Sequence, residues 1–319
     1  MRNHLLLIAL LLPGIGVAAD LPGIPQFVDE MVARHQFDRD HLEAVFAHAQ
    51  HRPAIIEAMS RPATRRPWPE YRASFVNAKR IKLGRAFAEK YRLTLQRAER
   101  RFGIPGDVIV ALIGVETIYG KNMGNYPVLD ALTTLAFDYP RRAEFFRGEL
   151  ENYLLLSREK GLDMLKTRGS YAGAIGIPQF MPSSYRRYAI DFNGNQTVDL
   201  RREARDAIGS VANYLQGYGW VAGQPIAERV NLGAEPQDLG PHTLAEWSTL
   251  GVVSSHVGAA PNLSARLLNF ATDAGDQEWW LAFENFEVVT RYNNSNYYAM
   301  SVTQLAEQLS QTHKLSSLR

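Results

Sequence analysis

Cysteine is absent from all 319 residues of the chain. This absence excludes disulfide bonds, thiol catalysis and cysteine-ligated zinc, and it also excludes a lipid attached to an N-terminal cysteine. Long apolar runs are scarce too. Beyond the N-terminal region no apolar stretch reaches the roughly 18 residues that a membrane-spanning helix needs. We therefore expect a mature chain with no transmembrane segment and no lipid anchor.

An excess of charge is also lacking, since 35 Lys and Arg face 33 Asp and Glu and the formal net charge is +2. Such a balance argues against nucleic acid as the main partner. Repeats and low-complexity segments are missing as well. What is present is 46% hydrophobic residues, enough to bury a sizeable core in one large domain or in two or three smaller ones.

The first residues have the order of an export signal. Arg2 precedes the apolar run Leu5–Leu12, which is too short to anchor a chain in a membrane, and helix-breaking and small residues follow it. Val17 and Ala19 are small residues at the positions that a signal peptidase reads, so we expect cleavage before Asp20. This pattern predicts a signal peptide over residues 1–19 and a mature protein in the periplasm.

Helical apolar spacing dominates the chain. It runs from Ile24 to about Arg100, except at 61–69, where three prolines predict an irregular segment across the surface. Asp107 and Gly120 are expected to cap the two ends of a strongly apolar helix. Helices are predicted over residues 107–119, 128–138, 143–159, 204–216 and 301–309.

Two segments differ from the helical regions in their amino-acid composition and pattern. Residues 221–255 contain Gly, Pro and short runs that favour strands, such as Ala227–Leu232, and they predict a small insertion with some strand. The apolar run Glu284–Thr290 predicts a buried strand or extended segment. It leads into Arg291–Asn294, whose polar and aromatic side chains are candidates for a site loop.

Glu116 is the main candidate for chemistry. It is the only side chain charged at neutral pH between Asp107 and Lys121, so its helix carries it among aliphatic neighbours. A carboxyl group desolvated in this way has a raised pKa and can hold a proton near neutral pH. The pattern alone also fits a glutamate on the solvent-facing side of an amphipathic helix.

The stretch from Ser170 to Tyr185 combines small residues and glycines with Gln, Ser and Tyr. Glycines let a ligand approach the backbone closely, and the polar and aromatic side chains suit the hydroxyls and faces of a sugar. A tightly packed turn between helices would have the same composition. The segment is therefore a candidate sugar-binding surface with a structural alternative.

Taken together, these segments resemble the lytic murein transglycosylase B family in its soluble form, which has a goose-lysozyme-like catalytic core. The resemblance spans most of the mature chain and keeps the family order of its motifs, a combination far more specific than any single motif. The motifs are Gly114-Val115-Glu116-Thr117, Tyr139-Pro140-Arg141-Arg142-Ala143, the Ser170–Tyr185 stretch, Arg291-Tyr292-Asn293 and Tyr297-Tyr298-Ala299-Met300.

The resemblance implies a role for each matching residue. Glu116 looks like the catalytic acid and base, and Ser170 and Gln179 look like residues that hold the sugar at the cleavage point. Phe180 resembles a packing residue near the acid. The other matching positions are Tyr292, Asn293 and Tyr298 on the opposite wall of the groove, Tyr71 and Tyr214 along the glycan, and Arg141 and Arg142 for the carboxylates of the peptide.

The implied reaction cleaves the β-1,4 bond between N-acetylmuramic acid and N-acetylglucosamine with one enzymic carboxyl group. Glu116 protonates the leaving oxygen and then takes the proton of the C6 hydroxyl, which closes a 1,6-anhydro ring. The acetamido oxygen of the substrate stabilises the oxocarbenium-like centre. No catalytic cofactor is needed.

The alternatives are a hydrolytic muramidase and a non-catalytic peptidoglycan-binding protein. A complex for cell-wall synthesis or remodelling is the expected partner.

A second motif, at 191–199, places oxygen side chains at every second position, as a calcium loop requires. It resembles the EF-hand-like loop of the family, which predicts structural Ca²⁺ or, alternatively, Na⁺. Gln196 stands where glycine eases the turn, and Arg202 stands where the bidentate glutamate belongs, so Glu203 or Asp206 would close the site. The predicted ligands are Asp191, Asn193, Asn195, Thr197 and Asp206. An Asx-rich turn is the alternative.

The expected fold is mainly α, a lysozyme-like catalytic core flanked by an N-terminal helical part and a small β-containing insertion. After the signal peptide at 1–19, we place the helical part at 20–100, the insertion at 221–271 and the core at 101–220 with 272–319. The EF-hand-like loop at 191–206 belongs to the core. Glu116, the Gln179 segment and the Tyr292 loop are expected to line one groove.

Overall fold

The structure is a computed structural model that describes residues 21–60, 66–233, 238–272 and 274–316. Helices dominate, as predicted, and the strands are few and short. The predicted signal peptide lies outside the described residues. Within them no helix combines the length and the apolar character that crossing a membrane requires. The chain forms two compact units, which are described separately: residues 1–60 with 125–173, and residues 61–124 with 174–319.

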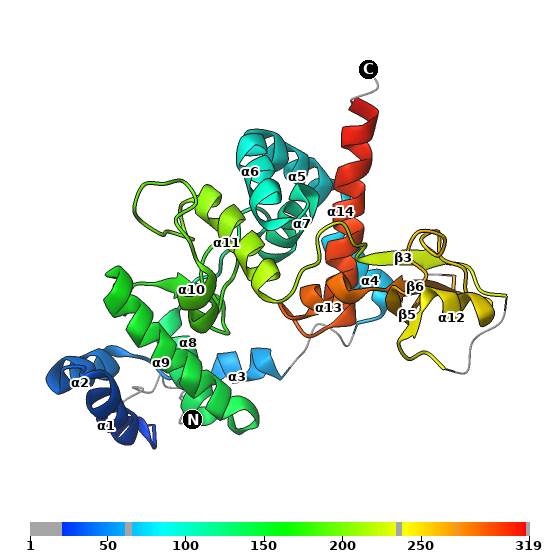
Figure 1. Ribbon diagram of the computed structural model, residues 1–319. Coiled ribbons are helices and arrows are strands. Elements are labelled where there is room, and N and C mark those ends of the chain that lie inside the picture. The colour runs from blue at the N-terminus through cyan, green and yellow to red at the C-terminus, as the bar shows by residue number, and fades with distance from the viewer. Residues whose placement is uncertain (1–20, 61–65, 234–237, 273, 317–319) are drawn as a thin grey trace, which may run out of the picture. The chain divides into compact units, whose positions relative to one another are not determined.

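The first unit consists mainly of helices (Figure 1) and contains one short antiparallel strand pair. Helices α8 and α9 pack closely against each other, and α3 packs against α8. The buried carboxylate of Asp130 on α8 accepts hydrogen bonds from the Gln50 N–H at 3.0 Å and from Arg52 Nε at 2.9 Å, which ties the ends of α2 and α3 to α8. The elements are α1 (Ile24–His35), α2 (Arg39–His48), α3 (Pro53–Met59), β1 (Tyr126–Pro127), α8 (Val128–Asp138), the 3-10 helix η3 (Pro140–Arg142), α9 (Ala143–Lys160) and β2 (Arg168–Gly169).

The second unit is organised around α7 (Gly106–Thr117), which packs against α14, α5, α6 and α11. Its side chains from Val108 to Val115 are buried, because a helix that is apolar on all sides has no face suited to water. The helices around it are α4 (Trp68–Phe75), α5 (Ala78–Lys90), α6 (Arg92–Phe102), α10 (Pro182–Tyr188), α11 (Ala204–Gly217), α13 (Glu284–Thr290) and α14 (Asn296–Ser316).

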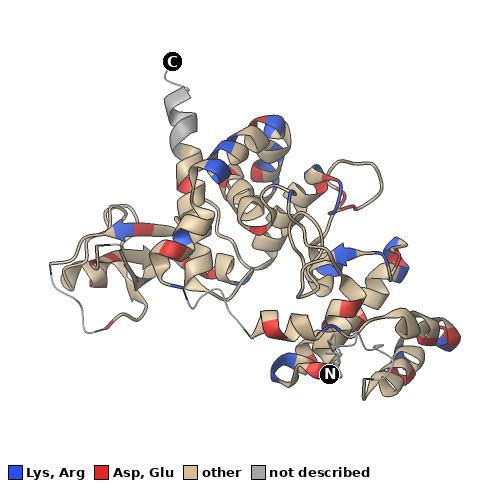
Figure 2. Ribbon diagram, turned by 180° about the vertical axis from the view of Figure 1, so that it is seen from behind, with Lys and Arg blue, Asp and Glu red and all other residues tan. Residues whose placement is uncertain are grey.

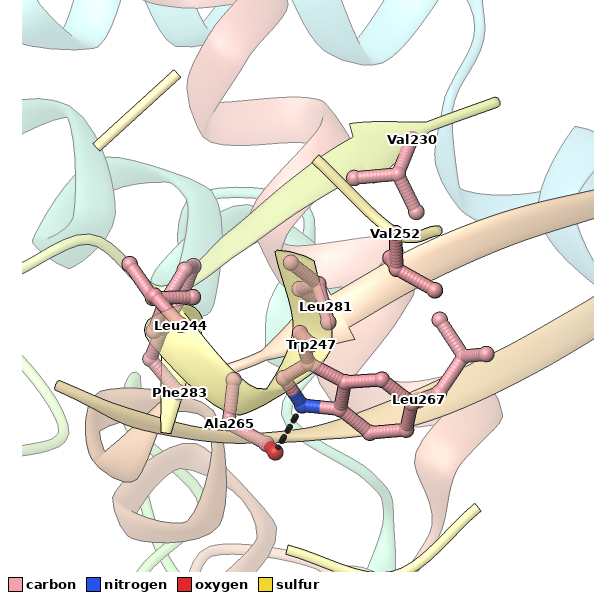
Figure 3. Close-up of a cluster of buried hydrophobic side chains, with 8 residues drawn as sticks. All are labelled: Val230, Leu244, Trp247, Val252, Ala265, Leu267, Leu281 and Phe283. Atoms are coloured by element: carbon pink, nitrogen blue, oxygen red, sulfur yellow. Dashed lines mark hydrogen bonds between the residues drawn. The ribbon is translucent and has the colours of Figure 1, made fainter. Parts of the chain in front are cut away.

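A four-stranded antiparallel sheet with α12 completes the second unit. Its strand order is β3-β6-β5-β4, so β3 lies at an edge. One face of the sheet and α12 enclose a cluster of buried side chains centred on Trp247, whose indole Nε1 donates to the Ala265 carbonyl at 2.7 Å (Figure 3). The elements are β3 (Ala227–Val230), β4 (His242–Thr243), α12 (Leu244–Thr249), β5 (Ser264–Ala271) and β6 (Gln277–Ala282).

Basic and acidic residues are mixed along the described helices and strands rather than separated into regions of one sign (Figure 2). In the first unit, Arg34 pairs with Glu151 at 3.0 Å and Arg147 with Glu30 at 2.6 Å. In the second unit, Arg266 pairs with Glu287 at 2.5 Å. The near-neutral composition is thus accompanied by ion pairs of opposite charge within each unit.

Several predicted elements are confirmed and two are wrong. The strand at 227–230 was expected, and the helix predicted at 128–138 has these bounds. Residues 284–290, predicted as a strand, form α13, because Asn285, Phe286, Val288 and Val289 are buried with helical spacing. The segment at 61–69 is not irregular throughout: α4 begins at Trp68, since Pro69 lies in its first turn and needs no backbone partner there. Residues 61–65 lie outside the described residues.

The ends of α7 also differ from expectation. The helix starts at Gly106, after Pro105, so Asp107 is a first-turn residue rather than the cap. It ends at Thr117, and the next residue, Ile118, adopts the left-handed conformation with φ 52°, two residues before Gly120. The boundaries drawn from the sequence differ from the observed units as well. Helices α8 and α9 belong with the N-terminal helices, and the sheet continues past residue 271 to Ala282 because β6 pairs with β5 and β3.

Candidate active site

Glu116 lies in the last turn of α7, and its side chain is half-buried. Burial raises the pKa of its carboxyl group from 4.5 to about 7, although the hydrogen bond from Tyr298 and the charge of Arg80 both lower it. Neither of these two groups is a carboxylate, so within the described residues no second acid shifts the Glu116 pKa. Glu116 is therefore a carboxyl group whose pKa lies near neutral pH.

Three tyrosines extend from this carboxyl group. The Tyr298 hydroxyl on α14 donates a hydrogen bond to Glu116 Oε1. The Tyr292 ring lies parallel to that of Tyr298, with the ring centres 6.5 Å apart and 15° between the planes. The Tyr214 ring on α11 follows at 4.7 Å from Tyr292. Since Tyr292 donates to the Pro178 carbonyl at 2.6 Å and Tyr214 to the Arg291 carbonyl at 2.7 Å, backbone contacts fix both rings.

The segment around Gln179 forms a tight turn beside the tyrosines. Ile175 and Phe180 exchange backbone hydrogen bonds of 2.8 and 3.1 Å across it. Gln179 adopts the left-handed conformation with φ 52°, and its amide nitrogen donates to the carbonyls of Gly176 at 2.8 Å and Met123 at 3.2 Å. Gly176 is required here, since a Cβ at this position would lie 2.5 Å from the Leu200 carbonyl oxygen. The segment is thus a tightly packed turn, one of the two alternatives drawn from the sequence, and sugar binding stays a prediction.

Phe180 and Tyr71 surround this centre with aromatic surface. Phe180 is buried, with its ring 5.4 Å from that of Tyr214 and 5.8 Å from that of Tyr292. Tyr71 on α4 is also buried, and burial together with the nearby Glu116 raises the pKa of its hydroxyl to about 12. Of the residues predicted from the resemblance, the structure therefore brings Glu116, Tyr298, Tyr292, Phe180, Tyr214 and Tyr71 together, with Gln179 in the adjoining turn.

Arg80 was missed by the sequence analysis. It lies on α5, donates a hydrogen bond to the Gly114 carbonyl and lowers the Glu116 pKa by its charge. Its own carbonyl accepts the Tyr119 hydroxyl at 2.9 Å. Gly84 and Gly114 leave room for that hydroxyl, since a Cβ at either would lie within 2.5 Å of it. The glycine within the Gly114–Thr117 motif was the available signal, but nothing in the sequence relates it to α5.

Four predicted residues are not part of this cluster. Ser170, Arg141 and Arg142 belong to the first unit. There, the Ser170 hydroxyl accepts the Ala172 N–H at 3.2 Å, and the Arg142 guanidinium lies over the Phe145 ring at 4.3 Å. Asn293 is exposed and directly follows Tyr292.

The loop at 191–199 is held by its own side chains. Asp191 accepts backbone N–H groups of Gly194 at 2.6 Å and Gln196 at 2.7 Å, and Gln196 takes the left-handed conformation where a standard loop has glycine. Asp206 is fully buried and accepts the N–H groups of Phe192, Asn193 and Asp199. The described residues contain no group of three or more acidic or histidine side chains placed to hold a metal, so an ion here would also need amide, hydroxyl or backbone oxygens.

Comparison with known proteins identifies relatives over nearly the whole chain. The model of the transglycosylase SLT domain family matches residues 21–307. The membrane-bound lytic murein transglycosylase B of Escherichia coli K12 is 40% identical over 304 residues, which cover 92% of this chain and 84% of that protein.

Solved structures of similar fold agree with this result. The soluble lytic transglycosylase SltB1 of Pseudomonas aeruginosa is 41% identical, with a TM-score of 0.85, 92% of this chain covered and 100% of that one. The Escherichia coli transglycosylase Slt35, solved in complex with calcium, is 38% identical at a TM-score of 0.84 and covers 93% and 95%. SltB3 of P. aeruginosa, solved with NAG-anhNAM-pentapeptide, is 32% identical at 0.80 and covers 90% and 78%. A family match over most of the chain, with relatives well above 30% identity, shows that this chain belongs to the SLT family of lytic transglycosylases.

Proposed function

We propose that this chain cleaves the β-1,4 bond between N-acetylmuramic acid and N-acetylglucosamine in peptidoglycan and leaves 1,6-anhydro-N-acetylmuramic acid ends. The observation that carries the proposal is the carboxyl group of Glu116, whose pKa burial raises to about 7 and which accepts a hydrogen bond from Tyr298. An acid with its pKa near the working pH can both donate and accept a proton. The relative solved with NAG-anhNAM-pentapeptide binds a compound with such an end, which supports the same product.

The mechanism uses Glu116 twice. Protonated Glu116 gives its proton to the oxygen that leaves with N-acetylglucosamine, and the C1–O bond breaks. The acetamido oxygen of the muramic acid stabilises the positive charge at C1, so no enzymic nucleophile is required. The Glu116 carboxylate then removes the proton of the C6 hydroxyl, and O6 bonds to C1. Glu116 ends protonated, and no water is consumed.

The surroundings of Glu116 stabilise both its protonated and its ionised form. The Tyr298 hydroxyl stabilises the carboxylate formed after the first proton transfer, whereas burial stabilises the acid. Tyr292, with its hydroxyl fixed on the Pro178 carbonyl, offers rigid ring surface to the sugar, and the buried Tyr214 ring packs against it. We assign Gln179, Phe180, Asn293 and Tyr71 to the same sugar-binding groove, Ser170 to the sugar at the cleavage point, and Arg141 and Arg142 to the carboxylates of the peptide.

A structural calcium ion in the loop at 191–206 is part of the proposal. The oxygens of Asp191, Asn193 and Asn195 are of the type that calcium prefers, and they belong to one loop. Asp206 accepts three backbone N–H groups and stabilises the loop, whereas Glu203 accepts a hydrogen bond from the Asn193 side-chain amide at 3.3 Å. Calcium in the Slt35 complex supports this assignment. Sodium is the alternative ion.

We further propose export to the periplasm by the signal peptide at 1–19. Peptidoglycan glycan strands would be the substrate there, and a cell-wall remodelling complex the partner. The catalytic core is assigned to residues 101–220 with 272–319, beside a helical part at 20–100 and a β-containing insertion at 221–271. Within this core, α8 and α9 belong to the first unit and would contribute to substrate binding, whereas proton transfer is assigned to Glu116 in the second unit.

The decisive experiment compares the wild-type protein with Glu116→Gln on purified murein and identifies the products by mass spectrometry. We expect the wild type to release muropeptides that end in the anhydro sugar and are lighter by one water than hydrolysis products. The amide variant should keep its fold and its binding but lose cleavage by about a hundredfold or more, as is typical for general acid–base catalysis. Reducing ends as the main product of the wild type would favour a hydrolytic muramidase. Binding of murein by the wild type without any cleavage would favour a binding protein.

A further inference from the structure

The residues that follow Glu116 form an unusual turn at the C-terminal end of α7. Ile118, Tyr119 and Gly120 have φ angles of 52°, 61° and 84°, so three successive residues lie in the left-handed region. Glycine adopts this region freely, but other residues do so at a cost, and a β-branched residue such as Ile118 is a genuine outlier there. Such a backbone persists only where surrounding contacts hold it, and such outliers cluster at active sites.

The Tyr119 side chain fastens this turn to a neighbouring helix. Its hydroxyl donates to the Arg80 carbonyl on α5 at 2.9 Å, and its ring lies 5.5 Å from the ring of Phe87 on the same helix. Arg80 makes a second contact, because its guanidinium donates to the Gly114 carbonyl in the last turn of α7. Helix α5, which packs against α7 (Figure 1), therefore holds the end of α7 at two points.

Two glycines inside helices make room for the Tyr119 hydroxyl. Gly84 lies in the middle of α5 and Gly114 near the end of α7, and a Cβ at either position would overlap this hydroxyl. A glycine inside a helix is destabilising relative to alanine. Two such positions, on different helices and facing one hydroxyl, indicate that the placement of the hydroxyl is specific.

The opposite side of the turn contacts the segment that fixes Tyr292. The hydroxyl of Thr117, the residue directly after Glu116, donates to the Ile177 carbonyl at 2.8 Å. The next carbonyl along that segment, of Pro178, accepts the Tyr292 hydroxyl at 2.6 Å. The end of α7 is therefore held between α5 and the segment that supports a tyrosine of the candidate active site.

The place of the Glu116 carboxyl group depends on this end of α7, because Glu116 lies in its last turn and meets the Tyr298 hydroxyl of α14. We propose that Tyr119 is a positioning residue for the cleavage reaction: its hydroxyl holds the left-handed turn 118–120 and thereby fixes Glu116 relative to the bond that breaks. A misplacement of about 1 Å can lower a rate by about a hundredfold. The inference rests on the proposed function in that Glu116 is taken as the reacting acid.

Tyr119→Phe tests the inference, since it removes the hydroxyl and keeps the ring. Initial rates are measured over a range of murein concentrations. We expect kcat to fall about tenfold and KM to stay within about twofold of the wild type, because Glu116 loses its alignment while the groups that bind the glycan keep theirs. Tyr153→Phe is the matched control: this fully buried tyrosine donates to the Met164 carbonyl at 2.8 Å, so its loss should lower the melting temperature and leave kcat unchanged.

A second variant separates positioning from a general loss of stability. Asparagine tolerates the left-handed region better than a β-branched residue does, so Ile118→Asn makes the turn less dependent on the Tyr119 hydroxyl. In this background, Tyr119→Phe should lower kcat by about threefold or less. A kcat of Tyr119→Phe within about twofold of the wild type, an equal loss in both backgrounds, or a rise in KM at unchanged kcat would overturn the inference.

The same assays keep this test distinct from that of the proposed function. Mass spectrometry of the wild-type products shows whether the ends are anhydro or reducing. Reducing ends would reject the proposed product, but the ratios of kcat would still test Tyr119, because proton donation by Glu116 is common to both reactions. Anhydro ends together with an unchanged kcat of Tyr119→Phe would reject the inference alone.

Discussion

At the scale of single residues, Glu116 combines opposing influences. Burial favours its protonated form, and Tyr298 and Arg80 favour its ionised form. The balance near pH 7 is what a group needs if it must give up a proton and then take one back. A change to one of these neighbours should therefore move the pH dependence of the reaction in a direction that the structure defines.

Tyr298→Phe tests this balance. Without the hydrogen bond to the carboxylate, the Glu116 pKa should rise, so the alkaline decline of kcat/KM, expected near pH 7 in the wild type, should move to higher pH while the maximum falls. Initial rates on murein across pH would measure it. Tyr214→Phe is the matched control, since its hydroxyl binds the Arg291 carbonyl. A shift of the decline to lower pH would contradict the assignment.

The Glu116 carboxyl group should lower the free energy of unfolding of the protein at alkaline pH. Its folded pKa of about 7 lies above the unfolded value of 4.5, so ionisation is harder in the folded state and stability is lost as pH rises between these values. Glu116→Gln should therefore raise the free energy of unfolding at pH 8, by roughly 2 kcal/mol once solvent screening is allowed for, and leave it nearly unchanged at pH 4. Denaturant titrations at both pH values, with the exposed Glu99→Gln as control, would measure the difference. An equal effect at the two pH values would rule out this cause.

At the scale of elements, the sequence predicts what depends on local pattern. The apolar helix that carries Glu116 was predicted within two residues, because charge is absent over one long run. The segment 284–290 was misassigned because a short apolar run with Val288 and Val289 fits a strand as well as a helix. The side chain of Asn285 favours the helix. This side chain hydrogen-bonds to the backbone of Val221 and Gln224 and fixes the turn on which α13 packs.

Contacts between distant elements could not be predicted in this way. The resemblance assigned Tyr298 and Tyr292 to one site. It did not predict that the Tyr298 hydroxyl donates a hydrogen bond to Glu116, which lies 182 positions earlier in the chain. That contact depends on the packing of α14 against α7. The role of Arg80 was missed for the same reason, because it depends on α5 packing against α7. Local patterns define elements, whereas the electrostatics of a site depend on which elements meet.

The loop at 191–206 gives a prediction at this scale. Calcium should raise the melting temperature by binding to the folded state alone, and Asp191→Ala should abolish this shift while murein cleavage continues, because the loop is distinct from the Glu116 cluster. Asp206→Asn should instead lower the melting temperature with or without calcium, since Asp206 accepts three backbone N–H groups. Scanning calorimetry with calcium and with chelator would separate the two effects. Identical curves in both solutions would favour a plain Asx-rich turn.

At the scale of the whole molecule, the chain passes between its two units at residues 60–61, 124–125 and 173–174. Most of the proposed roles divide along the same lines, and Ser170, assigned to the sugar but part of the first unit, is the exception. Glu116, the tyrosines and the Gln179 turn belong to the second unit, whereas Ser170 and the two arginines proposed for the peptide belong to the first. Cleavage of the glycan and recognition of its peptide should therefore be separable by mutation.

Arg141 and Arg142 allow that separation to be tested. Both are exposed, but the Arg142 guanidinium lies over the rings of Phe145 and Phe146 at 4.3 and 5.2 Å, so Arg142 has a packing role that Arg141 does not share. Arg141→Ala should raise KM about fivefold on murein that carries its peptides and leave kcat unchanged, as expected for the loss of one solvent-exposed contact with a carboxylate. On glycan strands stripped of peptide by an amidase, the same variant should match the wild type.

The companion variants sharpen this test. Arg141→Lys keeps the charge but cannot form the bidentate hydrogen bonds that a guanidinium makes with a carboxylate. Its KM should therefore lie between those of the wild type and Arg141→Ala. Arg142→Ala should lower the melting temperature of the protein, because the aromatic rings lose their covering guanidinium. Release of soluble muropeptides from the two substrates gives the kinetic constants. An equal rise in KM on peptide-free glycan would mean that Arg141 contacts the sugar strand or shapes the unit, and the peptide assignment would fall while the assignment of Glu116 would remain.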